Sequence, residues 1–328
     1  MNPVAHDGPL RVLVARAVFP DIIDPLRTVA EVETTPDDAV CTPEGLRQRL
    51  ADKHGAFITG SERIDAALLD ACPELKVIST MTVGIDHIDL AACAEHGVTV
   101  THAPDVLTET TADFGFALLL AAARQVGDAE RFLRAGQWSK WSVDLFAGAD
   151  VHGTTLGIVG MGRIGQAIAR RAAQGFRMRV LYHNRTPLKP ALEEELRAAY
   201  RDLPSLLRES RHVLLALPYS AAAHHLIGAE QLTLMQPGAT LVNIARGGVV
   251  DEAALAHALH SGRLGAAGLD VFEGEPAVNP ALLAAPRLVL TPHIASSSIP
   301  TRRAMAQLAV DNLLAVLQGQ PPLTPVMG

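Results

Sequence analysis

Three short segments in the second half of the chain carry side chains that could act together on one small substrate. They read Asn243-Ile244-Ala245-Arg246-Gly247, Glu275-Pro276, and Pro292-His293-Ile294-Ala295-Ser296. An arginine can bind a carboxylate through two parallel hydrogen bonds, and a histidine near neutral pH can give a proton to a carbonyl oxygen. A glutamate on the second ring nitrogen would keep that histidine protonated and oriented. Arg246, His293 and Glu275 therefore offer what the reduction of a 2-keto acid needs, provided that a hydride carrier binds beside them.

A glycine-rich segment upstream predicts the binding site of that carrier. Gly160-Met161-Gly162-Arg163-Ile164-Gly165 follows an apolar strand and precedes a helix expected over 166–173. Gly160 permits a tight turn, Gly162 lets the backbone approach a pyrophosphate, and Gly165 allows the helix to pack closely on the strand. The helix N-terminus and Arg163 add positive charge. The segment predicts a dinucleotide site.

The end of the next strand predicts which dinucleotide is preferred. An NAD site normally carries an acidic residue there, on the ribose hydroxyls, whereas this chain reads Tyr182-His183-Asn184-Arg185-Thr186. Asn184 does not repel a 2'-phosphate, and Arg185 with Thr186 could bind one through charge-assisted hydrogen bonds. We expect a preference for NADPH, with NADH possible. The alternative is that Arg185 is only a solvated surface cation.

Composition limits the classes of partner and compartment. The chain has 328 residues, 48% of them hydrophobic, and a net charge of -7, which favours a two-domain globular enzyme and disfavours binding to nucleic acid or to an anionic membrane. The three cysteines, Cys41, Cys72 and Cys93, match neither a zinc pattern nor a paired disulfide framework. We expect no metal, reduced thiols and, since the N-terminus lacks an export signal, a cytoplasmic protein with no membrane span.

Strands alternate with helices along the whole chain, which predicts an α/β fold. A first series of strands is expected at 11–15, 56–59, 76–79 and 98–100, and a second at 156–159, 179–182, 213–217, 240–243, 266–270 and 288–291. Helices are expected over 42–52, 64–71 and 301–318, and a joining piece covers 108–136. We expect two Rossmann-like domains with a deep interdomain cleft. A discontinuous, flavodoxin-like substrate domain would comprise 1–103 and 294–328, and an NAD(P)-binding domain 104–293.

The chain resembles the D-isomer-specific 2-hydroxyacid dehydrogenases, and among them the glyoxylate/hydroxypyruvate reductases. The likeness extends over nearly the whole chain. Besides the segments quoted above, it rests on Val83-Gly84-Ile85-Asp86-His87-Ile88-Asp89, Leu107-Thr108-Glu109-Thr110-Thr111-Ala112-Asp113, and Gly268-Leu269-Asp270-Val271-Phe272-Glu273-Gly274-Glu275-Pro276. The resemblance implies an NAD(P)-dependent oxidoreductase acting on the CH-OH group, with Arg246, Glu275 and His293 as the catalytic residues.

The resemblance also implies further sites. It assigns the backbone of Val83 and Gly84 to the substrate carboxylate, alongside Arg246 and His293, and implies a homodimer joined through the cofactor domains. Trp141 would approach the partner's active site or, alternatively, pack in a core. Asp270 would lie on the nicotinamide side or tune the His-Glu pair. The remaining residues expected to contact cofactor are Ile164, Leu217, Pro218, Ile244, Ala245, Arg246, His293 and Ala295.

Three functions compete. The leading one is reduction of glyoxylate or hydroxypyruvate to the D-2-hydroxy acid with hydride from NADPH. Another member of the same family, such as a 2-ketogluconate reductase or a phosphoglycerate dehydrogenase-like enzyme, would use the same chemistry, although the loops with Met81, Thr82 and Leu107 have no clustered arginines for a substrate phosphate. A dinucleotide-sensing corepressor or scaffold is disfavoured by the retained trio and the lack of a basic surface.

Overall fold

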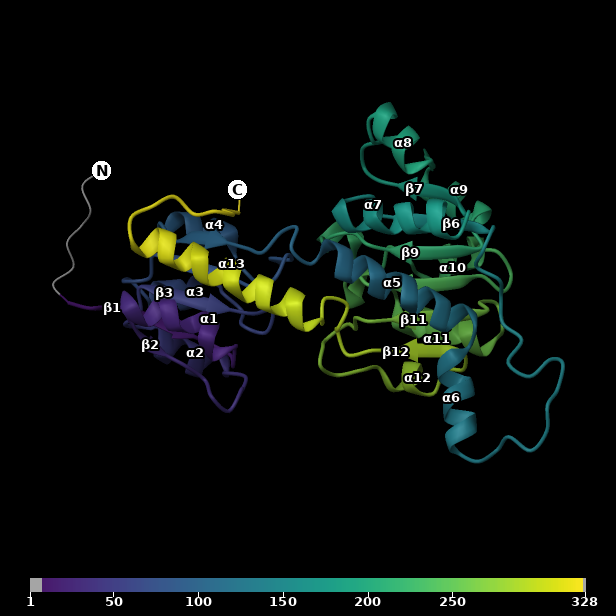
Figure 1. Cartoon of the computed structure of the whole chain (residues 1–328), viewed down its shortest axis with the longest axis horizontal. Helices are drawn as coiled ribbons and strands as arrows, with labels where there is room; N and C mark the ends of the chain where they lie inside the picture. The colour runs from purple at the N-terminus through teal and green to yellow at the C-terminus, as the bar shows by residue number, and fades with distance from the viewer. Residues whose placement is uncertain (1–7, 327–328) are drawn as a thin grey trace. The chain divides into compact units, whose positions relative to one another are not determined.

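The computed structural model describes residues 8–326 and divides into two compact units (Figure 1). Unit 1 is Met1–Leu107 with Ser298–Gly328, and unit 2 is Thr108–Ser297. The predicted boundaries, after residues 103 and 293, fall a few residues before these. Among the described residues, no helix has the length and apolar character needed to cross a membrane. The expected alternation of strands and helices is present in both units, so the α/β fold class is confirmed.

Unit 1 is built on one parallel sheet. Its strands are β1 (Leu10–Val14), β2 (Ala30–Glu33), β3 (Gly55–Ile58), β4 (Val77–Thr80) and β5 (Thr99–Thr101), in the order β2-β1-β3-β4-β5. This is the flavodoxin-like order. The three central strands and the edge strand β5 were predicted, but β2 was not. Its sequence, Ala-Glu-Val-Glu, places two carboxylates on an edge strand, where one side stays in water.

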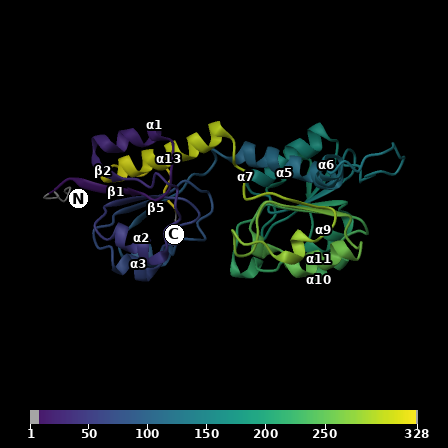
Figure 2. The same cartoon turned by 90° about the horizontal axis from the view of Figure 1, so that it is seen from below.

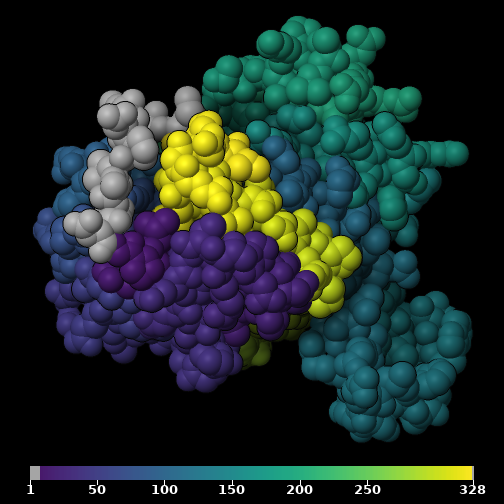
Figure 3. Space-filling view, turned by 60° about the vertical axis from the view of Figure 1, so that its left-hand side comes forward, coloured from purple at the N-terminus to yellow at the C-terminus, as the bar shows by residue number. Residues whose placement is uncertain are grey.

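Helices cover both faces of this sheet, with α1 and α13 on one side and α2 and α3 on the other (Figure 2). Their bounds are α1 (Pro20–Ile23), η1 (Asp24–Thr28), α2 (Pro43–Leu50), α3 (Ala66–Asp70), α4 (Leu90–Glu95) and α13 (Ile299–Leu317). Although α13 is remote in sequence, Leu313 and Leu317 lie beside Gly55 of β3. Figure 3 shows the same return, with yellow atoms of the C-terminal region against purple atoms of the N-terminal region. Unit 1 is therefore discontinuous in sequence.

Unit 2 contains a larger parallel sheet. Its strands are β6 (Thr155–Val159), β7 (Arg179–His183), β8 (Ala198–Tyr200), β9 (His212–Leu215), β10 (Thr240–Asn243), β11 (Ala266–Leu269) and β12 (Leu288–Leu290). The order β8-β7-β6-β9-β10-β11 is that of a dinucleotide-binding sheet, to which β12 adds one more strand. Six of the seven were predicted. The short edge strand β8, Ala-Ala-Tyr, contains no β-branched residue and was missed.

The helices of unit 2 pack on both faces of its sheet (Figure 2). On one face, Phe116 and Leu119 of α5 pack with Ile168 of α7 in one apolar core; on the other, Leu206 of α9 packs with Leu255 of α11. The bounds are α5 (Thr108–Ala123), α6 (Val126–Arg134), α7 (Arg163–Arg170), η2 (Arg171–Gly175), α8 (Pro190–Leu196), α9 (Leu203–Glu209), η3 (Ala221–Ala223), α10 (Ala229–Leu234), η4 (Gly247–Val249), α11 (Glu252–His260) and α12 (Pro280–Leu283).

The joining piece, 108–136, forms two helices rather than one. Helix α5 ends at Ala123, and Gln125, with a φ of +54°, turns the chain into α6. No residue of α6 is buried. Together with the segment that follows it, α6 extends beyond the rest of unit 2 (Figure 1). We call residues 126–150 the arm.

Candidate active site

The glycine-rich loop lies between β6 and α7, and its glycines are required for different reasons. Gly160 has a φ of +99°, and a Cβ there would lie 2.6 Å from the carbonyl oxygen of Ala216. A Cβ on Gly165 would lie 2.2 Å from the carbonyl oxygen of Gly160, so only glycine allows the helix to pack this closely. A Cβ on Gly162 would meet nothing within 4 Å. The loop thus leaves open space in front of a helix N-terminus, which suits a pyrophosphate.

The helix after this loop starts earlier than predicted. We expected it over 166–173, but α7 begins at Arg163, directly after Gly162. Arg163 and Ile164 therefore belong to the first helical turn, where backbone N–H groups have no partner within the helix. The difference brings the helix dipole closer to the space beside Gly162.

Asn184, at the end of β7, has a role that its sequence position did not reveal. Its Oδ1 accepts a hydrogen bond of 2.7 Å from the backbone N–H of Met161, in the glycine-rich loop. The side chain therefore ties the end of β7 to that loop. Arg185 and Thr186, the next two residues, are exposed. Within residues 8–326, Arg185 forms neither a hydrogen bond nor an ion pair.

Arg246 follows β10 in a loop that is held from within. Asn243, a buried residue, accepts from the N–H of Ala245 at 2.9 Å and donates to the carbonyl oxygen of Arg246 at 2.8 Å. The neighbouring Gly247 touches the loop after β11 so closely that a Cβ would lie 1.8 Å from the carbonyl carbon of Phe272. The loops carrying Arg246 and Glu275 are thereby packed backbone to backbone.

The structure brings Glu275 and His293 together. His293 Nδ1 lies 2.8 Å from Glu275 Oε2, and Glu275 Oε1 accepts the N–H of Phe272 at 2.8 Å. Burial acts to raise the pKa of Glu275, but the hydrogen bond and charge of His293, the Phe272 N–H and the charge of Arg246 outweigh it, so the pKa lies below its ordinary value. Glu275 is thus a carboxylate at neutral pH, and the Nε2 of the half-exposed His293 is the ring nitrogen left for a substrate.

Asp270 anchors the turn on which His293 stands. Its buried carboxylate accepts from the Thr291 hydroxyl at 2.7 Å and from the N–H groups of Ile294 at 2.9 Å and Ala295 at 2.8 Å. Burial raises the pKa of Asp270, although these donors act in the opposite direction. The backbone of His293 has a left-handed φ of +53°, a conformation that persists only where surrounding contacts impose it.

Two anchoring residues were not singled out in the sequence. Asn243 was quoted only as part of a motif, and Glu252 was not considered. The Oε1 of Glu252, which is only 6% exposed, accepts the N–H of Glu273 at 2.8 Å and so fixes the loop that ends in Glu275. Burial raises the pKa of Glu252, with the N–H of Glu273 opposing it. Asp251 is the N-cap residue of α11, so the sequence places Glu252 in the first turn of that helix. The sequence does not show which backbone N–H group donates to the buried Glu252 carboxylate.

The other predicted site residues divide between the two units. Leu217 and Pro218 follow β9, while Ile244, Ala245 and Ala295 are buried beside the ends of β10 and β12. Val83 and Gly84 lie in unit 1, after β4, where the Thr82 hydroxyl donates to the Gly84 carbonyl oxygen at 2.7 Å and His102 Nδ1 lies 3.1 Å from that of Val83. Trp141 is in the arm and is 76% exposed, so the core-packing alternative for it is wrong within this chain.

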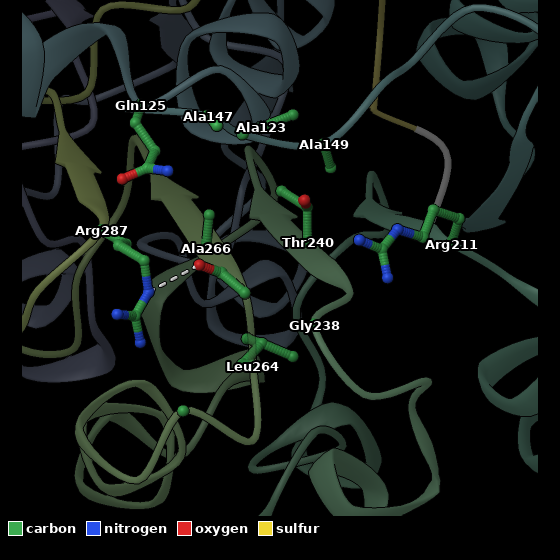
Figure 4. A pocket seen from close by; sticks show the side chains of 13 residues that line it. Ala123, Gln125, Ala147, Ala149, Arg211, Gly238, Thr240, Leu264, Ala266 and Arg287 are labelled. Atoms are coloured by element: carbon green, nitrogen blue, oxygen red, sulfur yellow. Dashed lines mark hydrogen bonds between the residues drawn. The ribbon is translucent and has the colours of Figure 1, made fainter. Parts of the chain in front are cut away.

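A hollow of about 360 Å³ in unit 2 lies away from these residues (Figure 4). It includes Thr240 and Ala266, the first residues of β10 and β11, and so marks the amino ends of the strands, whereas Arg246 and Asp270 follow their carboxyl ends. Its two arginines are bonded to backbone carbonyl oxygens, Arg287 to that of Gly265 at 2.8 Å and Arg211 to that of Pro237 at 3.0 Å. In α/β sheets the ligand site is at the carboxyl ends.

Comparison with known proteins agrees with this geometry. Residues 116–295 match the family model of the D-isomer specific 2-hydroxyacid dehydrogenase, NAD binding domain. A glyoxylate reductase of Thermococcus gammatolerans is 45% identical over 318 residues, 96% of this chain and 95% of that protein, and one of Thermococcus onnurineus is 46% identical over equal shares. An NADPH-dependent glyoxylate/hydroxypyruvate reductase from Sinorhizobium meliloti, solved with NADP and malonate, is 35% identical with a TM-score of 0.84, covering 97% of each chain.

These matches span nearly the full length of the chain, and the glycine-rich loop has the space and the helix N-terminus that a nicotinamide dinucleotide needs. The chain belongs to the D-isomer specific 2-hydroxyacid dehydrogenase family and is an NAD(P)-dependent oxidoreductase acting on the CH-OH group.

Proposed function

We propose that the protein reduces glyoxylate or hydroxypyruvate to the corresponding 2-hydroxy acid, which has the D configuration where the product is chiral. The observation that carries this proposal is the 2.8 Å contact between Glu275 and His293, with the Glu275 loop packed against the one that carries Arg246. Relatives named glyoxylate reductase share about 45% of the residues, which supports a small 2-keto acid as substrate.

Arg246, His293 and Glu275 each have a separate role in the proposed reduction. The guanidinium of Arg246 binds the substrate carboxylate and polarises the keto oxygen. The glycine-rich loop would hold the pyrophosphate of a reduced nicotinamide dinucleotide, whose nicotinamide would supply hydride to the keto carbon. The imidazolium of His293 gives its Nε2 proton to the keto oxygen as negative charge develops there. Glu275 holds Nδ1–H and stabilises the imidazolium, while Asp270 keeps the turn in place.

In this proposal, unit 2 serves as the cofactor domain and unit 1 as the substrate domain. The backbone of Val83 and Gly84 would bind the substrate carboxylate. Within residues 8–326, the N–H groups of these two residues donate no hydrogen bond, which supports this role.

We further propose that NADPH is preferred over NADH. Two observations at the end of β7 support this preference: the oxygen of Asn184 is engaged by the glycine-rich loop, and the exposed Arg185 is available for a 2'-phosphate. A guanidinium forms charge-assisted hydrogen bonds with phosphate oxygens that the 2'-hydroxyl of NADH cannot replace.

A homodimer joined through the cofactor domains is the third part of the proposal. The arm exposes several large apolar side chains, namely Leu133 at 59%, Trp138 at 58%, Trp141 at 76% and Val143 at 84%. A cluster of this kind marks an interaction surface. We also propose that the protein is located in the cytoplasm, as the reduced thiols lead us to expect.

A substrate panel run with both cofactors tests the function. Purified protein is mixed with glyoxylate, hydroxypyruvate, 2-ketogluconate or phosphohydroxypyruvate, and the consumption of NADPH or NADH is followed. We expect the highest kcat/KM for glyoxylate or hydroxypyruvate with NADPH. A clear preference for 2-ketogluconate or phosphohydroxypyruvate would show that the proposed substrate is wrong and that the protein acts on another 2-keto acid. No turnover with any of the four acids would contradict an enzymatic role.

A further inference from the structure

A second cluster of ligand-type side chains lies in unit 2, apart from the catalytic trio. His224 and His225 follow η3, and Glu273 lies in the loop after β11. Each side chain offers one ligand atom, and the three atoms lie within 4.8 Å of one another. We propose that His224, His225 and Glu273 bind one divalent transition-metal ion of the zinc class.

The two histidines already lie beside the carboxylate of Glu273. His225 Nε2 lies 3.0 Å from Glu273 Oε2, and His224 Nε2 lies 3.9 Å from Glu273 Oε1. The two imidazole rings are stacked, with centroids 4.0 Å apart and planes inclined by 20°. Around a zinc ion with bonds of about 2.0–2.2 Å, donor atoms stand roughly 3.3 Å apart. Rotation of these three side chains, each 40–45% exposed, would bring the ligand atoms to that spacing and turn the stacked rings so that both Nε2 lone pairs face the ion.

The backbone holds the two histidines in place before any ion binds. The N–H of His225 donates to the carbonyl oxygen of Gly248 at 2.7 Å, and the N–H of Ile227 donates to that of Val249 at 3.0 Å. His225 has a left-handed φ of +49°, which requires support from these contacts. On the other side, the N–H of Glu273 is fixed by Glu252. A site that is ordered in advance loses little conformational entropy on binding.

The surroundings favour a borderline metal over a hard cation. Two imidazole nitrogens and one carboxylate oxygen are the ligands of zinc-type sites, whereas calcium and magnesium take oxygen ligands. Tyr219 OH lies 3.1 Å from His224 Nδ1, so it can accept the Nδ1 proton and leave the Nε2 lone pair for the ion. His225 and Glu273 also line an open hollow of about 470 Å³ with Asp251 and Glu252, whose carboxyl groups add negative charge and whose space admits a water ligand.

An ion at this site would join two loops that carry catalytic residues. Glu273 is two positions before Glu275, and Gly248 is two positions after Arg246. The Gly248 segment is tightly packed on the site, because a Cβ on Gly248 would lie 3.1 Å from Tyr219 and 3.2 Å from His224. Binding should therefore stabilise the folded chain, since an ion that binds only the folded state raises its free energy of unfolding.

Titration of the purified full-length chain with Zn²⁺, after treatment with a chelator and its removal, tests the site without relying on catalysis. Calorimetry should show one ion per chain, and the melting temperature should rise in the presence of Zn²⁺. In H225A and in E273Q we expect the dissociation constant to rise at least tenfold, with the loss of the thermal shift. The matched control is H152A, which removes an exposed histidine elsewhere in unit 2 and should bind as the wild type does.

Cobalt spectroscopy decides whether the ion sits on these ligands. Co²⁺ should give the visible absorption of a nitrogen- and oxygen-ligated centre, which H224A abolishes, and circular dichroism verifies that each variant is folded. The proposal is overturned if Zn²⁺ does not bind, if H224A, H225A and E273Q bind as tightly as H152A, or if a thiolate charge-transfer band shows that a cysteine holds the metal. None of these results depends on which substrate the enzyme reduces.

Discussion

The end of β7 and the ends of β10, β11 and β12 lie at the same edge of one parallel sheet, yet they are built differently. At the catalytic end, the buried side chains of Asn243, Glu252 and Asp270 each form hydrogen bonds with the backbone of a loop. The loops after β10 and β11 are packed against each other. At the end of β7, side-chain contacts of His183 with the Arg201 carbonyl oxygen and of Asn184 with the glycine-rich loop precede an exposed arginine. Proton transfer needs a donor held in place, whereas recognition of a phosphate needs an available charge.

The largest effect is expected at the proton donor. His293→Ala removes the group that protonates the keto oxygen, so kcat should fall by about 10²- to 10⁴-fold, the range typical of general acid catalysis. Steady-state NADPH consumption with glyoxylate measures it. His152→Ala, a change in an exposed histidine elsewhere in unit 2, should retain wild-type kcat. A His293→Ala enzyme with more than a tenth of wild-type kcat would remove His293 from the mechanism.

The next effect should come from Asp270, which anchors the turn on which His293 stands. In Asp270→Asn, the side-chain NH2 group takes the place of Oδ2, which accepts the N–H of Ala295. One buried hydrogen bond is lost, and the amide NH2 then faces the Ala295 N–H, so two donors oppose each other. We expect a loss of about 1–3 kcal/mol in the free energy of unfolding and a fall in kcat of about tenfold, because the turn that carries His293 loosens. Urea unfolding and steady-state kinetics measure both.

Thr291→Val provides the graded comparison for this anchor. It removes the Thr291 hydroxyl, with its 2.7 Å hydrogen bond to Asp270 and its 3.3 Å contact with the Leu269 carbonyl oxygen, and leaves both N–H donors to Asp270, so both effects should be smaller. If Asp270→Asn left stability and kcat unchanged, the rigid support of the catalytic end would be refuted.

At the end of β7 the expected effect is confined to one cofactor. Arg185→Ala should raise KM for NADPH about tenfold, because one hydrogen bond to a charged group is lost. It should leave KM for NADH and the free energy of unfolding nearly unchanged. Lys189→Ala, in the same exposed segment, is the matched loss of a cation and should affect neither cofactor. Equal changes for NADPH and NADH would show that Arg185 does not contact a 2'-phosphate.

The smallest effect is expected in the arm. If Trp141 reaches the partner's site, Trp141→Ala should raise KM for the keto acid by a few-fold, whereas Trp138→Ala should change only the dimer dissociation constant, through the loss of buried apolar area. Sedimentation equilibrium and kinetics separate the two effects. A monomeric wild-type protein at micromolar concentration would contradict the proposed homodimer.

Runs of apolar residues predicted most of the strands, because buried parallel strands are nearly continuous apolar runs. This pattern missed β2 and β8, which are short edge strands with charged or small residues. The positions of Glu275 and His293 after strands were enough to predict that these two side chains meet, while the place of Arg246 beside them stays a prediction. The supports of Asn243 and Glu252 were not predictable, since these are contacts of buried side chains with backbone groups distant in space. Consecutive histidines lack the spacing of a metal motif, so His224 and His225 also gave no signal.

The pH dependence of kcat/KM for glyoxylate in the wild type and in Glu275→Gln tests the central claim most directly. Because the pKa of Glu275 is lowered, its carboxylate is charged throughout the neutral range and stabilises the protonated imidazole of His293. The amide in Glu275→Gln keeps a hydrogen bond but not the charge. We predict that the rate of reduction then falls at a lower pH than in the wild type, with activity regained on acidification. Superimposable profiles would contradict the pairing of Glu275 with His293 as the proton donor.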